Sequence, residues 1–489
     1  MKKSAVIGSG IGGLGSALRL AAKGYDVTVY EQAAIPGGKI SQIRDKGFRF
    51  DTGPSLFTLP NQVDELFELF GEKPEDHFRY NKLDTSCKYF WDDGTVLNAW
   101  QETESFAREI EEVTGVPQKS IDGFLKKSRK LYDVTADIFM FNSLHKLKNF
   151  TTPNFRKSLL QIHELDAFTS MHKKNAQWFS HPRIVQLFDR YATYNGSDPY
   201  QTPATLNIIA HLEHNIGAFF PERGMYSIIE SLVNLAERKG IKFLYNTPVQ
   251  EIIIEGKKIS AIRANDKIEK YDLVVSDVDV DTFYRKLMPA DHKPPRSPLK
   301  TQRSTSALIF YWGVDKTFPE LDVHNILFSD DYRKEFSHLF ESRTISPDPT
   351  VYLFISSKVV ERDAPEGSEN WYVMINVPEN VGQDWDSMIA EARRNIINRI
   401  NHVLNMDIEK HIQFEHMTDP RTIEEKTGSF RGSLYGPSSN SRFAAFLRHP
   451  NFRRKYKNLF FTGGSVHPGG GIPLCLASAK IVGQEIPEA

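Results

Sequence analysis

Glycines near the start of the chain are spaced in a way that suits the binding of phosphate groups. Gly8, Gly10 and Gly13 follow an apolar segment, residues 5–7, and precede an apolar pattern that is typical of a helix. In such a G-x-G-x-x-G turn the first glycine permits a tight bend. The second lets the backbone approach a pyrophosphate, and the third lets the helix pack on the strand. The N–H groups at the start of the helix would bind the phosphates.

An acidic residue ends the next expected strand, residues 25–30. Glu31 lies about 20 residues past Gly13, where it can accept a hydrogen bond from a ribose hydroxyl. An acid at this position disfavours a 2′-phosphate, so NADP is a poor fit. An ordinary βαβ unit would explain the order of the elements, but it needs no such concentration of glycines at one turn. The segment therefore predicts a dinucleotide site.

Further glycine turns favour a flavin nucleotide over a nicotinamide one. A nicotinamide cofactor would not need additional close approaches of the backbone, whereas an extended flavin nucleotide would. One of the turns lies near the end of the chain, so both ends would meet at one ligand. The turns are Gly37-Gly38-Lys39, Gly53-Pro54-Ser55, Gly463-Gly464 and Gly469-Gly470-Gly471-Ile472-Pro473, the last before a helix expected from about Leu474.

The composition is that of an ordinary globular protein and excludes several classes. The 489 residues suggest two large domains or about three smaller ones. With 40% hydrophobic and 25% charged residues, the chain is neither disordered nor collagen-like. A net charge of −1 gives no basic field for duplex nucleic acid. Two cysteines, Cys87 and Cys475, provide neither a disulfide framework nor a cysteine-rich metal site, and they fit a reducing compartment.

Two uncharged stretches could be mistaken for targeting or membrane segments. Residues 4–18 follow two lysines, as in a secretory signal, but glycines interrupt the apolar run and no small-residue cleavage site follows. Residues 458–479 are long enough to span a bilayer. Their glycines and prolines would leave backbone groups without hydrogen bonds in lipid. We therefore expect no transmembrane helix.

Together these motifs resemble a known family, the FAD-dependent, bacterial-type carotenoid (phytoene) desaturases, within the flavin amine oxidase fold group. The resemblance covers nearly the whole chain. The first glycine motif is shared by many flavoproteins, whereas the last is much more particular to carotenoid desaturases and their relatives. The matching segments are residues 8–31, 36–39, 50–54, 194–199, 203–204, 220–225, 463–473 and 478–480.

The resemblance implies an α/β fold in two parts. One is a Rossmann-like FAD-binding domain of the flavin amine oxidase and glutathione-reductase-like group, discontinuous over residues 1–75, 220–290 and 420–489. The other is an inserted α+β domain that binds substrate and associates with the membrane, over residues 76–219 and 291–419.

The resemblance also implies which residues contact FAD. Besides the glycine turns they include Val249, similar to the residue whose backbone meets adenine, and the turn at Ser276 and Asp277. Ordinary strand ends of a small sheet are the alternative explanation for these last positions. The full set is Gly8, Gly10, Ile11, Gly12, Gly13, Glu31, Gln32, Gly37, Gly38, Lys39, Gly53, Pro54, Ser55, Val249, Ser276, Asp277, Gly463, Gly464, Gly471, Ile472 and Pro473.

One segment points to a branch of the family. Residues 51–60 look more like the hydroxycarotenoid desaturases than the phytoene enzymes. Two departures affect loop geometry rather than the family. Arg223 stands where the first glycine of a pair is usual, and Arg448-His449-Pro450 replaces a shorter Arg-Pro.

A member of this family would dehydrogenate a C–C single bond of an acyclic carotenoid, with or without a hydroxyl, and so extend its polyene. FAD takes one hydrogen as hydride. The proton left on the delocalised allylic cation is acidic, so a weak base would suffice. Quinone or oxygen would serve as re-oxidant. Because the substrate dissolves in lipid, the enzyme would be cytoplasmic and peripherally bound to the inner face of the membrane.

Residues 143–174 are a candidate for that membrane contact. They carry an excess of Lys and Arg with interleaved Leu and Phe, a mixture that can enter an anionic lipid surface. A solvated face over an ordinary core helix is the equally good alternative.

No residue is assigned as the catalytic base, and no metal is expected. His467 is expected to be a loop residue bonded to the backbone. His211 and His214 share a helix face, but without further ligands we interpret them as structural.

Other functions fit the same fold. They are an oxidase of amines or porphyrinogens, a polyene isomerase that uses reduced flavin, and a non-enzymatic escort of prenylated proteins. An assay with polyenes would distinguish a desaturase from an oxidase of amines or porphyrinogens. The product mass would distinguish it from an isomerase, and uptake of flavin would distinguish it from an escort protein.

Overall fold

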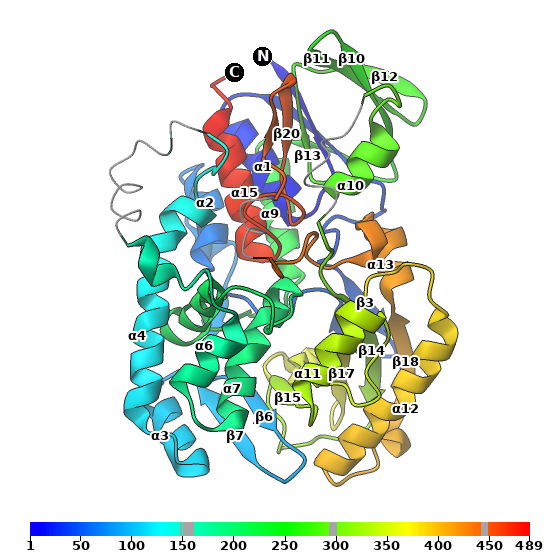
Figure 1. Ribbon diagram of the computed structural model, residues 1–489. Helices are drawn as coiled ribbons and strands as arrows, with labels where there is room; N and C mark the ends of the chain where they lie inside the picture. Colours follow the sequence, from blue (N-terminus) through cyan, green and yellow to red (C-terminus); the bar gives the residue numbers. More distant parts are fainter. Residues whose placement is uncertain (147–148, 150–160, 293–300, 442–447) are drawn as a thin grey trace.

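Figure 1 shows the computed structural model of the chain, which describes residues 1–146, 149, 161–292, 301–441 and 448–489. Both chain ends lie together at the top of the view, beside one sheet. A second, larger sheet and two groups of helices lie below it.

The first sheet is built from short apolar strands separated by helices. Its neighbouring strands run parallel, except for the antiparallel pair β19 and β20. A parallel sheet is covered on both faces, and β13 is accordingly buried along its whole length. In spatial order the strands are β19 (Phe452–Arg453), β20 (Tyr456–Phe461), β13 (Leu273–Ser276), β1 (Lys3–Ile7), β2 (Asp26–Tyr30) and β9 (Lys242–Leu244).

Helices α1 (Ile11–Ala22), α9 (Ser227–Arg238) and α15 (Ile472–Glu485) pack in one hydrophobic core on one face of this sheet. Helices α1 and α15 lie side by side (Figure 1), because a small residue is present at their contact. A Cβ on Gly15 would lie only 3.1 Å from that of Ala479. On the other face lies an antiparallel sheet of β10 (Val249–Glu255), β11 (Lys258–Ala264) and β12 (Lys267–Lys270).

The larger sheet is mixed and carries different side chains on its two faces. Only the pair β6 and β15 is parallel among its described neighbours. One face packs against α12 (Trp385–Val403). In spatial order the strands are β18 (Ile412–Thr418), β14 (Ser306–Val314), β17 (Glu369–Val377), β16 (Val351–Ile355), β15 (His324–Leu327), β6 (Thr85–Phe90) and β7 (Val96–Trp100).

A helical layer lies beside strands β6 and β7 (Figure 1). It contains α3 (Thr103–Thr114), α4 (Gln118–Thr135), α6 (Met171–Trp178), α7 (Pro182–Asp189) and α8 (Ile208–Ala210), with the π-helical turns η2 (Ala136–Met140) and η7 (His211–Ile216). Short elements complete the described chain: β3 (Gln42–Asp45), β4 (Phe48–Asp51), β5 (Tyr80–Lys82), β8 (Phe219–Pro221), α2 (Asn61–Glu68), α10 (Val280–Thr282), α11 (Tyr332–Ser337) and α13 (Pro420–Thr427).

The two sheets fall into different parts of the sequence. All strands of the first sheet lie within residues 1–75, 220–290 and 420–489, and all strands of the larger sheet lie within residues 76–219 and 291–419. None of the helices in the described ranges is long and apolar enough to cross a membrane.

Candidate cofactor and substrate site

The first glycine turn joins β1 to α1 and brings the start of the helix close to its neighbours. Gly8 has φ of +97°, a left-handed conformation that favours glycine. A Cβ on Gly13 would collide with the carbonyl oxygen of Gly8, so only glycine lets α1 start this close to β1. Ile11 is the first residue of α1 and is buried. The N-terminus of α1 therefore lies against the backbone of the turn, and its Gly13 N–H donates to the Asp277 carboxylate.

The second and third turns close over the first. The N–H of Gly37 donates to the carbonyl oxygen of Ser9 at 3.0 Å. Gly38 adopts φ of +59° and lies against Gly10, since a Cβ there would be 3.5 Å from the Gly10 Cα. Behind them, a Cβ on Gly53 would collide with the carbonyl oxygen of Lys39.

The last turn reaches the same place from the other end of the chain. A Cβ on Gly12 would lie 2.9 Å from the Gly463 nitrogen. Gly464 packs against Gly470, whose Cα would be 3.2 Å from an added Cβ. The structure thus brings together the glycine turns that are far apart in the sequence.

The helix that follows begins slightly earlier than the sequence predicts. It starts at Ile472 rather than near Leu474, directly after Gly471 with φ of +99°. Pro473 is accommodated because a proline in the first turn loses no helical hydrogen bond.

Glu31 organises the edge of the site next to the first turn. Its carboxylate accepts hydrogen bonds from the Ser9 N–H at 2.9 Å and the Ser9 hydroxyl at 2.6 Å. The Thr247 N–H donates to the Glu31 carbonyl at 2.8 Å, so the segment that leads into Val249 lies beside it. Gln32, in contrast, is exposed and donates to the Lys426 carbonyl at 3.1 Å.

Lys39 and Ser276 hold other parts of the site in place. The Lys39 ammonium donates to the Leu434 carbonyl at 2.7 Å, and burial lowers its pKa. Ser276 ends β13, and its carbonyl accepts the Thr462 N–H at 2.9 Å. The first contact links the second glycine turn to the segment at Leu434, and the other links the end of β13 to the residue before Gly463.

Asp277, predicted to lie beside the nucleotide, extends its carboxylate into the space between the turns. An added Cβ on Gly12 would lie 2.7 Å from Asp277 Oδ1, and Cβ atoms on Gly10 and Gly463 would collide with the same carboxylate. The pKa of Asp277 is raised to about 7, mainly by burial and in addition by Glu31, while the Gly13 N–H and Lys39 act in the opposite direction. An acidic group therefore lies at the N-terminus of α1.

The glycine turns at Gly8–Gly13, Gly37–Gly38, Gly53 and Gly463–Gly471 form one surface, which we call the cradle. The cradle fits a nucleotide with a pyrophosphate. Much of its surface is backbone from turns where a Cβ on Gly10, Gly12, Gly13, Gly53 or Gly463 would collide, and it lies at the N-terminus of α1. Glu31 lies directly after β2, where a dinucleotide would place its ribose. The fit is thus to a dinucleotide, with the C-terminal turn as an additional wall.

A face of tyrosines on the larger sheet borders the site, and sequence analysis did not identify it. Side chains alternate along a strand, so Leu353 and Val373 face α12 while Tyr352, Tyr372 and Tyr311 face the opposite way. The Tyr311 and Tyr352 rings lie 5.6 Å and 6.1 Å from the Tyr372 ring. The Tyr311 hydroxyl donates to the Thr52 carbonyl at 3.3 Å, next to Gly53.

An apolar region continues from the start of α15 toward the helical layer. Six of its members are only partly buried, so they border accessible space rather than a closed core. The cluster consists of buried Leu59, Ala136 and Met140 with partly buried Tyr132, Phe141, Ile208, Leu212, Ile216 and Leu474. We call it the apolar path.

A buried ion pair lies within the helical layer. Arg190 lies 3.5 Å from Glu213 and within 5.3 Å of the ring centres of Tyr89, Tyr191 and Tyr194. Burial would raise the pKa of Glu213, but Arg190 and the tyrosine hydroxyls hold it below its usual range.

The histidines singled out in the sequence bind protein groups. His214 Nε2 is 2.7 Å from the Tyr191 hydroxyl, and His211 Nδ1 is 2.8 Å from the Asn215 amide. His467 Nε2 is 3.0 Å from the Asn142 carbonyl, which confirms its bond to the backbone, and burial lowers its pKa to about 4. Among the described residues, no group of His, Cys, Asp and Glu could hold a metal.

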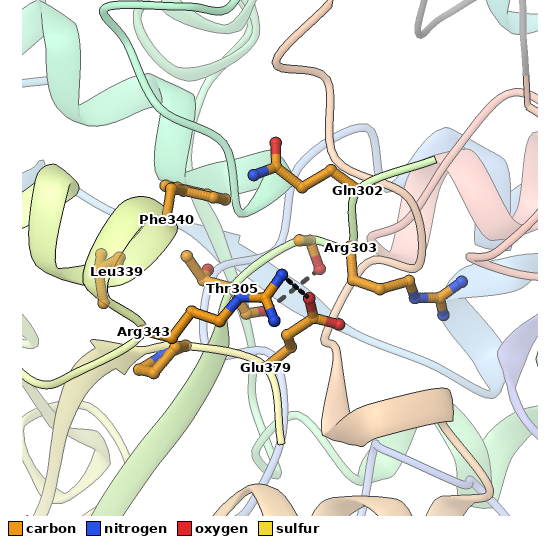
Figure 2. Close-up of a pocket in the computed structure, with 9 residues that line it drawn as sticks. Gln302, Arg303, Thr305, Leu339, Phe340, Arg343 and Glu379 are labelled. Carbon is orange, nitrogen blue, oxygen red and sulfur yellow. Dashed lines mark hydrogen bonds and ion pairs between the residues drawn. The ribbon is translucent and has the colours of Figure 1, made fainter. Parts of the chain in front are cut away.

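A separate recess lies beside the start of β14 (Figure 2). Arg343 and Glu379 form an ion pair across it at 3.8 Å, while Arg303 extends away and pairs with Asp281 at 2.8 Å. Its charged lining does not suit a hydrocarbon. The lining residues are Gln302, Arg303, Ser304, Thr305, Leu339, Phe340, Arg343, Pro378 and Glu379.

The predicted membrane-contact tract, residues 143–174, lies partly outside the described residues. Within the described part, Lys146 pairs with Glu485 at 3.0 Å and Lys174 with Asp166 at 2.8 Å. Phe168 is 82% exposed.

The chain is similar to proteins of known type over its whole length. Residues 11–487 match the family model for flavin containing amine oxidoreductases. A 1-hydroxycarotenoid 3,4-desaturase of a Flavobacterium species is 46% identical over 487 residues, covering 100% of this chain and 99% of the relative. A 4,4′-diapophytoene desaturase of Staphylococcus haemolyticus is 30% identical, covering 99% of this chain and 98% of the relative.

Solved structures share the fold at low identity. Cyclohexylamine oxidase from Brevibacterium oxydans gives a TM-score of 0.62 at 13% identity, covering 99% of this chain and 98% of that chain. This likeness supports the architecture of a nucleotide-binding sheet joined to a mixed sheet.

Proposed function

The chain belongs to the family of flavin containing amine oxidoreductases, and on that premise we propose that it is a FAD-dependent carotenoid desaturase. Its substrate is an acyclic carotenoid with a hydroxyl on C1, and the new double bond forms between C3 and C4. The observation that carries this proposal is the 46% identity, end to end, to a 1-hydroxycarotenoid 3,4-desaturase. The resemblance at residues 51–60 supports the same branch.

FAD is the flavin that suits the cradle. The N-terminus of α1 and the backbone at Gly10, Gly12 and Gly463 would hold its pyrophosphate. Glu31 would accept a hydrogen bond from the ribose, and the turn at Gly53 with the start of α15 would border the ring. When bound, FAD supplies two-electron oxidation of a C–C bond, with transfer of a hydride.

The protein residues position the substrate and exclude water. The apolar path would bind the hydrocarbon, because its partly buried side chains can be covered by a polyene. The tyrosine face would hold the two carbons that are oxidised next to the cradle. No strong base is needed, since the proton that leaves lies next to a delocalised cation.

The solubility of the substrate in lipid indicates where in the cell the enzyme would act. We infer peripheral association with the cytoplasmic face of a membrane, from which a lipid-soluble substrate would enter the apolar path. The final electron acceptor would be a quinone or oxygen.

Product analysis tests the function. Purified protein, supplied with FAD and a 1-hydroxylated acyclic carotenoid, should give a product that lacks two hydrogens and absorbs at longer wavelength. A product of unchanged mass would instead indicate an isomerase. Oxidation of an amine or porphyrinogen, with the carotenoid unchanged, would place the chain with other oxidases of this fold.

A further inference from the structure

A chain of hydrogen bonds lies between the Gly53 turn and the larger sheet. The Ser55 hydroxyl lies 2.6 Å from the Tyr352 hydroxyl, which lies 2.7 Å from His324 Nδ1. Ser55 and Tyr352 are half-buried, whereas His324 is only 3% exposed. The series of hydrogen bonds therefore runs from the partly exposed hydroxyl of Ser55 to the buried imidazole of His324.

His324 is the closed end of this chain. Its ring stacks on Phe354 at 5.2 Å, and burial lowers its pKa to about 3, so the imidazole is neutral. Its Nε2 is buried and has no hydrogen-bond partner within the ranges that the structure describes. A change in hydrogen bonding at His324 must therefore pass through Tyr352.

Within this series, the Ser55 hydroxyl is the group that can still form a further hydrogen bond. If His324 Nδ1 accepts the Tyr352 proton, Tyr352 accepts from Ser55, and the Ser55 oxygen is left as an acceptor. If the order is reversed, Ser55 is left as a donor. A hydroxyl group can donate and accept, so an alcohol satisfies Ser55 in both arrangements.

The reaction itself demands a polar group here. In a 1-hydroxycarotenoid, C1 is two bonds from C3, so the hydroxyl oxygen lies within about 4 Å of a carbon that is oxidised. A residue that recognises this hydroxyl must therefore lie beside the ring end of the cradle. Ser55 is two residues past Gly53, which packs on Lys39 of the second turn. Leu56, the residue after Ser55, packs against the same hydrophobic core as Tyr352, so an apolar side chain adjoins the Ser55 hydroxyl in the sequence.

We propose that Ser55, held by Tyr352 and His324, is the residue that recognises the C1 hydroxyl of the substrate and so selects hydroxylated carotenoids. The proposal rests on the proposed function. A carotenoid without the hydroxyl leaves Ser55 with an unmade hydrogen bond in an apolar surrounding, which is the usual origin of discrimination against such analogues. Ser55 and Tyr352 act as specificity residues, and His324 positions Tyr352.

The test compares two substrates in the same FAD-loaded enzyme. A 1-hydroxylated acyclic carotenoid and its counterpart without the hydroxyl are assayed separately for kcat/KM. We expect Ser55→Ala and Tyr352→Phe to lower the preference for the hydroxylated substrate by roughly 10- to 100-fold. Ser55→Thr, which keeps the hydroxyl, should retain most of the preference.

A matched control removes a different buried tyrosine hydroxyl. Tyr271 bonds Tyr30 at 2.7 Å, on the far side of the first sheet. Tyr271→Phe should leave the preference unchanged. Bound flavin is measured by absorbance in every variant.

Three outcomes overturn the proposal. An equal loss for both substrates would assign Ser55 to the reaction rather than to recognition. Loss of bound FAD in Ser55→Ala would make Ser55 a cofactor contact. An unchanged preference in both variants would remove it from substrate binding. Failure of the proposed function is distinct, because the unmodified enzyme would then desaturate neither carotenoid.

Discussion

At the scale of single residues, Asp277 controls how the cradle receives an anion. Its carboxylate lies between Gly10, Gly12 and Gly463, where a pyrophosphate would bind. Two negative groups at one helix terminus repel each other, so binding favours a protonated or displaced Asp277. The charged or ionisable groups that face it are Glu31, Lys39 and Cys475.

The affinity for FAD should therefore depend on pH. Burial raises the pKa of Asp277 to about 7, so the group is largely neutral below that pH and charged above it. We expect affinity to be highest below pH 7 and to fall above it, by at most about tenfold per pH unit. Asp277→Asn should bind more tightly at pH 8 and lose this dependence. Titrations of FAD fluorescence from pH 6 to 9 measure both effects, and parallel curves for the two proteins would contradict the account.

The buried pair of Arg190 and Glu213 makes a second prediction at this scale. Arg190→Met leaves a buried carboxylate without its cation and should reduce the free energy of unfolding by about 3–5 kcal/mol. Adding Glu213→Gln should recover much of that loss. Denaturation in urea measures it, and a single variant as stable as the unmodified protein would show that the pair is not an energetic unit.

At the scale of elements, the glycine turns were predictable and the tyrosine face was not. A glycine turn is a local requirement of the backbone, so Gly8 to Gly13 and the turn at Gly463 can be recognised in the sequence. The inner strands of the larger sheet are buried or nearly buried on both faces, with no exposed residue in β14, β15, β16 or β17. Without alternation between polar and apolar residues, the sequence does not show that Tyr352 and Tyr372 share a face.

The variant Gly12→Ala tests whether the glycine turns near the two ends of the chain form one site. In Gly12→Ala the new Cβ would lie 2.9 Å from the Gly463 nitrogen, so α1 and the last turn must separate. We expect bound FAD to fall at least tenfold, read from the ratio of flavin to protein absorbance. Gly123→Ala is the control, because that glycine lies within α4, where a Cβ meets only the end of the Trp178 ring at 3.1 Å. Equal flavin content in both variants would refute the convergence.

At the scale of the whole molecule, the proposed function requires that the substrate pass from lipid into the apolar path. Phe168 is 82% exposed, and Lys173, further along the chain, is also exposed, a combination that suits an anionic bilayer surface. The double variant Phe168→Ser and Lys173→Glu should reduce sedimentation with anionic vesicles several-fold. Ile268→Ser with Lys267→Glu is the matched control, since Ile268 is 55% exposed on β12, which lies away from α6 in Figure 1. An equal effect of the two double variants would argue against a specific membrane face.

The central claim is that both ends of the chain form one FAD site beside the bound polyene. A single turnover without oxygen tests it most directly, with FAD-loaded enzyme mixed with a 1-hydroxylated carotenoid. The account predicts that flavin absorbance is lost at the same rate, and in the same amount, as the longer polyene appears. Formation of the polyene with the flavin still oxidised, or a protein that takes up no FAD, would contradict it.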